Sequence, residues 1–289
     1  MKHTSVTQPD ASREEGLSPR DFARLRELIY AETGICLSPE KQTMVEVRLK
    51  RRLRALNMET YAIYCQFLFD RHGIKQELVH LINVITTNKT DFFREPAHFD
   101  FLAQRALPET APNDRPFLVW SAGCSSGEEP YTLAMVLSEY AITHPGFRFR
   151  ILATDISTAV LEKAQLGVYS SETIAPVPLA LKRKYLMRSR DAQRSRVVPE
   201  LRNLIEFRRL NFMDADYALA EKADAIFCRN VLIYFDRATQ ERILQKLVRN
   251  LVRSGYLFVG HSETLHDMDL AVMPVAPALY RNAHARNHK

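Results

Sequence analysis

From residue 117 onward, short runs rich in β-branched and aromatic residues alternate with longer segments whose apolar residues recur at helical spacing. We expect strands over residues 117–122, 149–155, 205–212, 224–230 and 255–262. We expect helices from about Pro130, from about Ser157 and over about 237–251. Such alternation is typical of an α/β domain with a doubly wound parallel sheet. The last segment, VMPVAPALYRN, can add an antiparallel edge strand.

The earlier part of the chain lacks this alternation and has the pattern of an all-α domain. We expect helices over residues 19–33, 39–56, 61–69 and 74–85. Val45, Leu49, Leu53 and Leu56 recur at helical spacing and predict one apolar stripe on the second helix. Residues 1–16 show no apolar periodicity, so we expect them to form a disordered tail.

The domain division follows from these patterns. We expect an all-α N-terminal domain over 17–92, a linker helix over 93–116 and the α/β domain over 117–289. Residues 168–204 break the alternation with three prolines and short β-like pieces, which predicts a small inserted β-subdomain. Basic residues are dense in and just after this insertion, where they form either a binding surface or a solvated face.

Composition narrows the class of protein. The chain of 289 residues is 46% hydrophobic and carries a net charge of +6, which suggests an acidic partner. No apolar run is long enough for a membrane helix and the N-terminus has no apolar signal segment, so we expect a cytoplasmic protein without membrane insertion. The four cysteines form no C-x-x-C pair, and we expect no metal site and no disulfide framework.

The loop after the first strand, in VWSAGCSSGEEP, permits two functions. Gly123 to Gly127 fit G-x-S-x-G, the elbow that presents a nucleophilic serine in α/β-hydrolases. Asp224 and His261 follow Ser125 in the order of a hydrolase triad. In α/β-hydrolases, however, several strands of the sheet precede the one that leads into the elbow. Ser125 instead follows the first strand that we expect. This position disfavours a hydrolase.

A nucleotide cofactor explains the loop better. Small residues from Gly123 to Gly127 would give a ligand access to the backbone, and Asp155 ends the next strand, where an acid can accept ribose hydroxyls. A helix cap is the other role open to Asp155. The dinucleotide fingerprint G-x-G-x-x-G is absent. S-adenosylmethionine has no pyrophosphate to cradle, so a methyltransferase is the favoured interpretation.

Several segments resemble, in order, the motifs of the chemotaxis-receptor glutamate O-methyltransferases, the CheR family. They are TTNKTDFFRE (86–95), WSAGCSSGEEPYTLAM (120–135), ATDIS (153–157), LNF (210–212), CRNVLIYFD (228–236) and GYLFVGHSE (255–263). The resemblance runs from about residue 17 onward. It implies a class I S-adenosylmethionine-dependent methyltransferase fold, with an all-α N-terminal domain and an inserted β-subdomain. It also implies methyl transfer to glutamate side chains of methyl-accepting chemotaxis receptors.

The resemblance assigns cofactor contacts to nine positions. They are Asn88, Thr90, Arg94, Glu129, Asp155, Asn211, Phe212, Asn230 and Val231. The first three would close over the methionine part, Glu129 would accept a hydrogen bond from the amino group, and Asp155 would bind the ribose. Asn211 and Phe212 would frame the adenine. Structural roles stay open for Glu129, which can stabilise a helix N-terminus, and for Asn230, which can be a turn residue.

The implied chemistry needs no general base, because a glutamate with a pKa of about 4.3 is already an anion at neutral pH. We expect Arg94 to orient the substrate carboxylate and Tyr234 to line the methyl-transfer site. The structural alternatives are an ion pair between Arg94 and Glu95 and a core position for Tyr234.

The second helix carries a basic face for substrate docking, formed by Arg48, Arg51, Arg52 and Arg54. The family's substrates are glutamate-rich helical bundles, so we expect docking there, with a solvated face as the alternative. Family members that tether to a receptor C-terminal peptide share a glycine-rich loop in the inserted subdomain. Here the matching stretch, MRSRDAQRSRVVPEL, has no glycine, and we expect no dependence on such a tether.

Two other functions remain as alternatives. A nucleic-acid methyltransferase shares the cofactor domain, but amino-directed enzymes of that kind carry a D/N-P-P-Y/F motif that the stretch from Asn230 to Tyr234 lacks. We therefore expect no nucleic acid as partner. Another acidic protein as substrate, or a non-catalytic cofactor-binding adaptor, stays open.

Overall fold

The computed structural model describes residues 16–70, 72–112, 114–190 and 193–283. Except for Gly16, the tail expected over residues 1–16 lies outside these ranges. Internal contacts divide the chain into two compact units. One holds residues up to Leu28 together with Leu37–Ile85, and the other holds Ile29–Cys36 together with the chain from Thr86 onward.

The first unit is helical, as predicted. Its elements are α1 (Pro19–Thr33), which continues into the second unit, η1 (Pro39–Lys41), α2 (Gln42–Ala55), α3 (Tyr61–Leu68) and α4 (Gly73–Ile85). The Ser18 hydroxyl accepts the Asp21 amide at 3.1 Å and so caps the start of α1. Val45, Leu49 and Leu53 of the apolar stripe are buried, whereas Leu56 follows the last turn of α2 and is only partly buried. Helix α2 packs against α4.

The second unit is built on a seven-stranded sheet. Its order is β6 (Ile205–Arg209), β2 (Phe149–Asp155), β1 (Phe117–Ala122), β7 (Ala223–Cys228), β8 (Leu251–Val259), β10 (Leu279–Asn282) and β9 (Val272–Ala276). The first five strands run parallel to one another. β10 runs antiparallel to both β8 and β9. The predicted parallel sheet is confirmed, and the C-terminal segment supplies two strands where one was expected.

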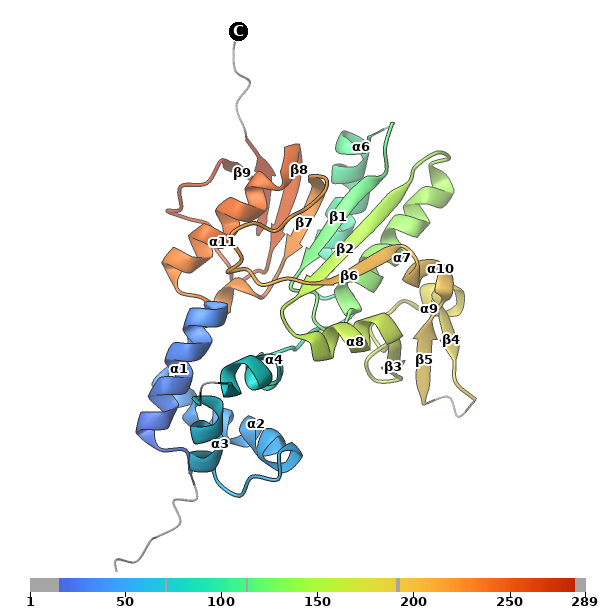
Figure 1. Ribbon diagram of the computed structural model, residues 1–289. Coiled ribbons are helices and arrows are strands. Elements are labelled where there is room, and N and C mark those ends of the chain that lie inside the picture. Colours follow the sequence, from blue (N-terminus) through green and yellow to red (C-terminus); the bar gives the residue numbers. More distant parts are fainter. Residues whose placement is uncertain (1–15, 71, 113, 191–192, 284–289) are drawn as a thin grey trace, which may run out of the picture. The chain divides into compact units, whose positions relative to one another are not determined.

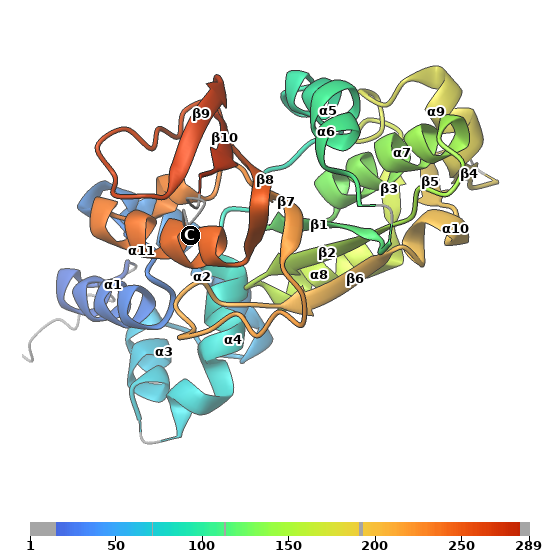
Figure 2. The same cartoon turned by 90° about the horizontal axis from the view of Figure 1, so that it is seen from above.

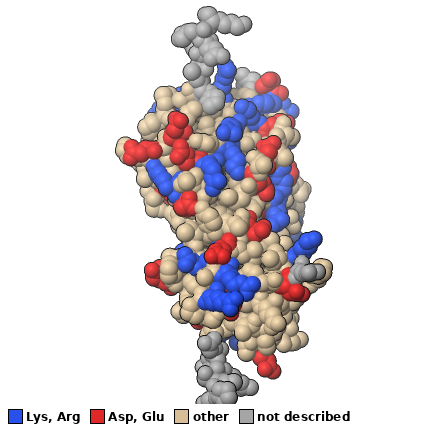
Figure 3. All heavy atoms as spheres, turned by 60° about the vertical axis from the view of Figure 1, so that its left-hand side comes forward, with Lys and Arg blue, Asp and Glu red and all other residues tan. Residues whose placement is uncertain are grey.

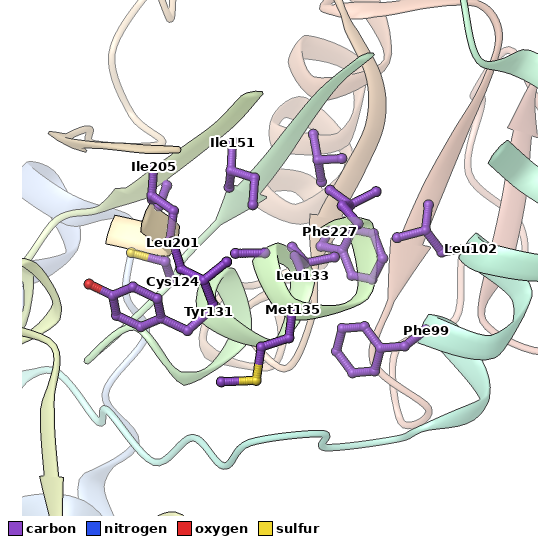
Figure 4. Packing of buried hydrophobic residues seen from close by; sticks show 14 of the residues in the cluster. Phe99, Leu102, Cys124, Tyr131, Leu133, Met135, Ile151, Leu201, Ile205 and Phe227 are labelled. Atoms are coloured by element: carbon purple, nitrogen blue, oxygen red, sulfur yellow. The ribbon is translucent and has the colours of Figure 1, made fainter. Parts of the chain in front are cut away.

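Helices cover both faces of this sheet because alternate side chains of each strand point to opposite faces. Phe117 and Val119 of β1 belong to one buried cluster. Helix α7 (Glu128–Thr143) completes it with Tyr131, Leu133 and Met135 (Figure 4). Leu118 and Trp120 belong to a second cluster, which α11 (Arg237–Arg249) completes. The two helices accordingly lie on opposite sides of the sheet (Figures 1 and 2).

The other helical elements around this sheet precede β1 or follow β2 and β7. A continuous helical run precedes β1 and consists of α5 (Ala97–Phe101), the π-helical η2 (Leu102–Ala106) and α6 (Leu107–Thr110). Helix α8 (Thr158–Leu166) follows β2, and the short 3₁₀ helix η3 (Leu232–Tyr234) follows β7. Within the described residues, no helix is both long and apolar enough to cross a membrane.

The inserted segment forms its own small sheet between α8 and β6. The antiparallel order is β3 (Val168–Ser170), β5 (Arg194–Val197) and β4 (Leu186–Arg188), with α9 (Leu179–Tyr185) and α10 (Pro199–Arg202) beside it in sequence. This is the predicted β-subdomain. Its side chains Arg188, Arg194 and Arg196 are exposed.

Candidate functional site

The loop after β1 has an unusual backbone. Gly123, Ser125 and Gly127 adopt the left-handed region, with φ of 87°, 49° and 99°. A Cβ on Gly123 would lie 2.5 Å from a methyl carbon of Val231, and one on Gly127 would lie 2.8 Å from the Tyr169 hydroxyl. The space beside these two glycines is therefore filled by protein atoms. The two glycines thus let the loop pack against Val231 and Tyr169, and access of a ligand to the backbone of this loop stays a prediction.

Ser125 is held inside this loop. Its side chain donates a hydrogen bond to the Asn88 carbonyl at 2.9 Å, and the residue is 7% exposed. Asp224 lies at the start of β7, at the opposite end of that strand from the loop residues. There its carboxylate binds Arg115 and the Leu118 amide. Ser125, Asp224 and His261 therefore do not form the serine–histidine–aspartate triad that the hydrolase interpretation requires.

Asp155 is the acid at the end of β2. One carboxylate oxygen accepts the Ser125 amide at 2.9 Å and the other accepts the Ser157 amide at 2.9 Å. Burial raises the pKa of this carboxyl, while the backbone hydrogen bonds act in the opposite direction. Each oxygen has a second lone pair, so Asp155 can hold two loops and still accept hydroxyl groups from a ligand.

Glu129 lies in the first turn of α7. One oxygen accepts the Ser121 hydroxyl at 2.7 Å, and the other pairs with the Arg229 guanidinium at 3.1 Å. Burial raises the pKa of this carboxyl, and the positive charge of Arg229 opposes that rise. The residue is thus a fixed acceptor as well as a favourable charge at a helix N-terminus.

Arg229 is a central residue that the sequence analysis did not select. Its side chain is 2% exposed and bridges Glu129 and Glu95, each at 3.1 Å. It also donates to the Arg94 carbonyl. Arg229 outweighs the effect of burial on Glu95 and lowers the pKa of that carboxyl. Two carboxylates and one guanidinium leave an excess of one negative charge in this network.

The segment from Asn88 to Glu95 is anchored by these contacts. Phe93 and Glu95 have positive φ, and the Phe93 amide donates to the Thr132 hydroxyl at 3.2 Å. The Arg94 side chain donates to the Lys89 carbonyl at 3.2 Å. The ion pair with Glu95 that was considered for Arg94 is made by Arg229 instead. Thr90, on the same segment, is partly buried.

The loop after β7 is fixed by a second residue that the sequence analysis did not select, Glu263. Its buried carboxylate accepts the backbone amides of Asn230 at 2.9 Å and of Leu232 at 2.7 Å, together with that of Gly260 at 2.6 Å. Asn230 has a φ of 58°, as expected for a turn, and its side chain also approaches Glu95 at 3.4 Å. The sequence signals that could have identified Glu263 and Arg229 were the acid in GHSE and the arginine in CRN.

The residues expected around the adenine lie on the loop after β6. The Asn211 side chain accepts the Met213 amide and donates to the Glu32 carbonyl at 2.6 Å. Phe212 is 9% exposed and packs edge-on against Tyr217 and Phe235. Their side chains thus have structural partners.

Tyr234 lies on η3, after β7. It is partly buried, and its carbonyl accepts the Cys36 amide at 2.8 Å.

Five of the expected residues are linked through shared partners: Ser125 binds Asn88 and Asp155, Arg229 binds Glu129 and the Arg94 carbonyl, and Glu95 joins Asn230 to Arg229. Val231 lies beside Gly123. Thr90 lies on the same segment as Asn88 and Arg94. Asn211, Phe212 and Tyr234 lie on the neighbouring loops. Buried acceptors and an excess negative charge suit a ligand that carries an ammonium group and ribose hydroxyls.

The basic face of α2 belongs to the first unit. Arg52 makes two hydrogen bonds to the buried Glu77 carboxylate, at 2.6 and 2.8 Å, and Arg48 donates to the Ile85 carbonyl. Arg51 and Arg54 are exposed, as is the neighbouring Lys50. In Figure 3, Lys and Arg side chains form several separate groups among acidic ones.

Comparison with known proteins matches both units to one family. Residues 20–86 match the family model "CheR methyltransferase, all-alpha domain", and residues 88–277 match "CheR methyltransferase, SAM binding domain". The chain is 42% identical over 283 residues to chemotaxis protein methyltransferase 2 of Pseudomonas aeruginosa. The matched residues cover 97% of this chain and 99% of the Pseudomonas protein. This chain is 41% identical over 255 residues to the chemotaxis protein methyltransferase of Escherichia coli, with coverage of 88% and 87%.

Proposed function

Because the chain belongs to the CheR family of S-adenosylmethionine-dependent chemotaxis methyltransferases, we propose that it forms methyl esters on glutamate side chains of methyl-accepting chemotaxis receptors. The observation that carries the proposal is the set of buried acceptors at the strand ends, Glu129 and Asp155, next to an arginine that can face a substrate carboxylate.

The acceptor set fits the cofactor. Asp155 keeps lone pairs for ribose hydroxyls, and Glu129 is a fixed acceptor for the amino group. Asn88, Thr90 and Arg94 lie on one segment that would close over the methionine part. The side chains of Asn211 and Phe212 contact other protein groups, so their backbone groups would meet the adenine. Asn230 and Val231 would border the remainder of the cofactor.

When bound, S-adenosylmethionine supplies a methyl group that is already activated by its sulfonium. A substrate glutamate with a pKa of about 4.3 is an anion at neutral pH. Ester formation from a carboxylate moves no proton, so the residues of the site need to orient the substrate and exclude water, and no base is required. Arg94 would orient the carboxylate through its guanidinium, and Tyr234 would line the place of transfer.

We propose that α2 provides the receptor-docking face, with Arg51, Arg54 and the neighbouring Lys50 as its exposed charges. Arg48 and Arg52 belong to the same helix but also hold the unit together. The partner would be the cytoplasmic helical bundle of the receptor, because its glutamates complement this charge.

Independence from a receptor tether is part of the proposal. It rests on the absence of glycine from MRSRDAQRSRVVPEL, which spans β4 and β5. Titration of a receptor C-terminal pentapeptide into the protein by calorimetry tests it. We expect no heat of binding at micromolar peptide, and micromolar affinity would contradict the expectation.

Methyl transfer from labelled S-adenosylmethionine to receptor-containing membranes, followed by mild alkali, tests the ester. Carboxyl methyl esters release volatile methanol, whereas N-methyl products keep the label. We expect Arg94→Ala to bind cofactor but to transfer methyl far more slowly. The exposed Arg105 pairs only with Glu109 among the described residues, so Arg105→Ala is the matched control and should retain the rate. Alkali-stable label would contradict the proposal, and cofactor binding without any transfer would favour the adaptor.

A further inference from the structure

His98 is a buried polar side chain that the proposed methyl transfer does not use. The residue is 1% exposed, and neither of its ring nitrogens makes a hydrogen bond within the described structure. A buried polar group without a partner costs about 1–3 kcal/mol. The imidazole therefore needs a ligand or ordered water beside it.

Two further ligand-type side chains converge on this ring. Nδ1 of His98 lies 3.5 Å from Oε2 of Glu95, and Nε2 of His261 lies 3.9 Å from the same oxygen. The two imidazole rings meet edge to face, with centroids 5.1 Å apart. One ligand atom from each of the three residues lies within 4.8 Å of the others.

These separations are close to those of a metal site. Zinc bonds of 2.0–2.2 Å in a tetrahedral arrangement place ligand atoms about 3.3 Å apart. The two contacts of the Glu95 oxygen exceed that value by a few tenths of an ångström. The His261 side chain is 56% exposed, so its ring can move inward without disturbing the core.

The local charge also permits a cation, although Arg229 lies nearby. Arg229 is 3.1 Å from the Glu95 oxygen that the ion would share. Glu129 also binds Arg229, so this guanidinium keeps a carboxylate partner when Glu95 turns to the ion. The excess negative charge of the Arg229 network would offset part of the charge of the ion.

We propose that Glu95, His98 and His261 form a binding site for a divalent transition-metal ion, with Zn²⁺ as the best match to two imidazoles and one carboxylate. The fourth position would hold water. This revises the expectation of no metal site, which rested on cysteine spacing and could not detect ligands separated by more than 160 residues. The inference does not depend on the identity of the methyl acceptor.

Zinc titration of the untagged, chelator-treated full chain, in competition with a chromophoric chelator, tests the site. The background should carry His284→Ala and His288→Ala, because these C-terminal histidines are spaced four residues apart and can bind zinc themselves. We expect one equivalent to bind. His261→Ala should weaken binding on the order of tenfold or more, and His261→Asp should recover part of it.

The matched control is His266→Ala, since His266 is also exposed but lies outside the cluster. It should leave zinc affinity unchanged. Co²⁺ substitution should give the visible absorption of a tetrahedral site in the background protein and lose it in His261→Ala. Binding of no stoichiometric zinc, or equal affinity in His261→Ala and His266→Ala, would overturn the proposal.

Discussion

Replacement of Arg229 by methionine should damage both folding and cofactor binding. The substitution keeps an unbranched apolar stem but removes the charge that pairs with Glu95 and Glu129. Removal of one partner from a buried ion pair costs about 3–5 kcal/mol, because the remaining charge stays buried without compensation. That is a large share of the 5–15 kcal/mol that stabilises a typical domain.

Cofactor affinity should fall for a separate reason. Burial already raises the pKa of Glu129, and Arg229 is the positive charge that opposes protonation. Without Arg229, the pKa of Glu129 would rise further, and its carboxylate would lose the partner that orients it. Loss of one charge-assisted hydrogen bond, worth about 1.5–3 kcal/mol, corresponds to a loss in affinity of about tenfold to hundredfold.

Urea denaturation and calorimetry with S-adenosylmethionine measure the two effects, and Arg115→Met provides the matched control. Arg115 pairs with the buried Asp224 at the start of β7, whereas Arg229 follows the end of that strand. Both variants should lower the free energy of unfolding, and only Arg229→Met should weaken cofactor binding. Equal cofactor affinity in the two folded variants would refute the reasoning.

Three further predictions test other parts of the protein. Gly123→Ala should destabilise the protein by about 2–4 kcal/mol in urea denaturation, because its φ is positive and its Cβ would overlap Val231. Adding Val231→Ala should relieve about 1 kcal/mol of that cost. If the destabilisations of the two substitutions were strictly additive in the double variant, the packing argument would be contradicted. Burial raises the pKa of Asp155, so its carboxylate is protonated at a higher pH than that of a free aspartate. Cofactor affinity, measured by calorimetry, should therefore fall on acidification from pH 7 toward the usual aspartate pKa of about 3.9. An affinity independent of pH over that range would contradict a carboxylate role. Arg52→Met should lose about 3–5 kcal/mol of stability, whereas Arg54→Glu should keep its stability and slow receptor methylation; the reverse pattern would assign docking to Arg52.

The sheet and its order of elements could be predicted because parallel strands leave continuous apolar runs in the sequence. β1 and β2 match the expected ranges to the residue, whereas β8 begins at Leu251, four residues earlier than expected. Asp155 could be predicted because its place at a strand end is a local property. The same logic located Glu129 at the start of a helix.

Residues that act through long-range contacts were missed. Arg229 and Glu129 are 100 positions apart, and Glu263 binds amides 31 and 33 positions before it. The residues next to an arginine in the sequence do not indicate whether its side chain is buried or exposed at a strand end. Arg52 could have been recognised, because it lies three residues after the buried Leu49 and so shares the face of α2 that packs inward.

The chemical group that receives the methyl distinguishes the proposed function from its alternatives. Tandem mass spectrometry of a purified receptor cytoplasmic domain, incubated with the protein and S-adenosylmethionine, measures it directly. We predict the added mass of one methylene on glutamate side chains of the helical bundle, and its near absence with Arg94→Ala. A methyl group found on lysine or arginine, or on no receptor residue while the cofactor still binds, would contradict the proposed function.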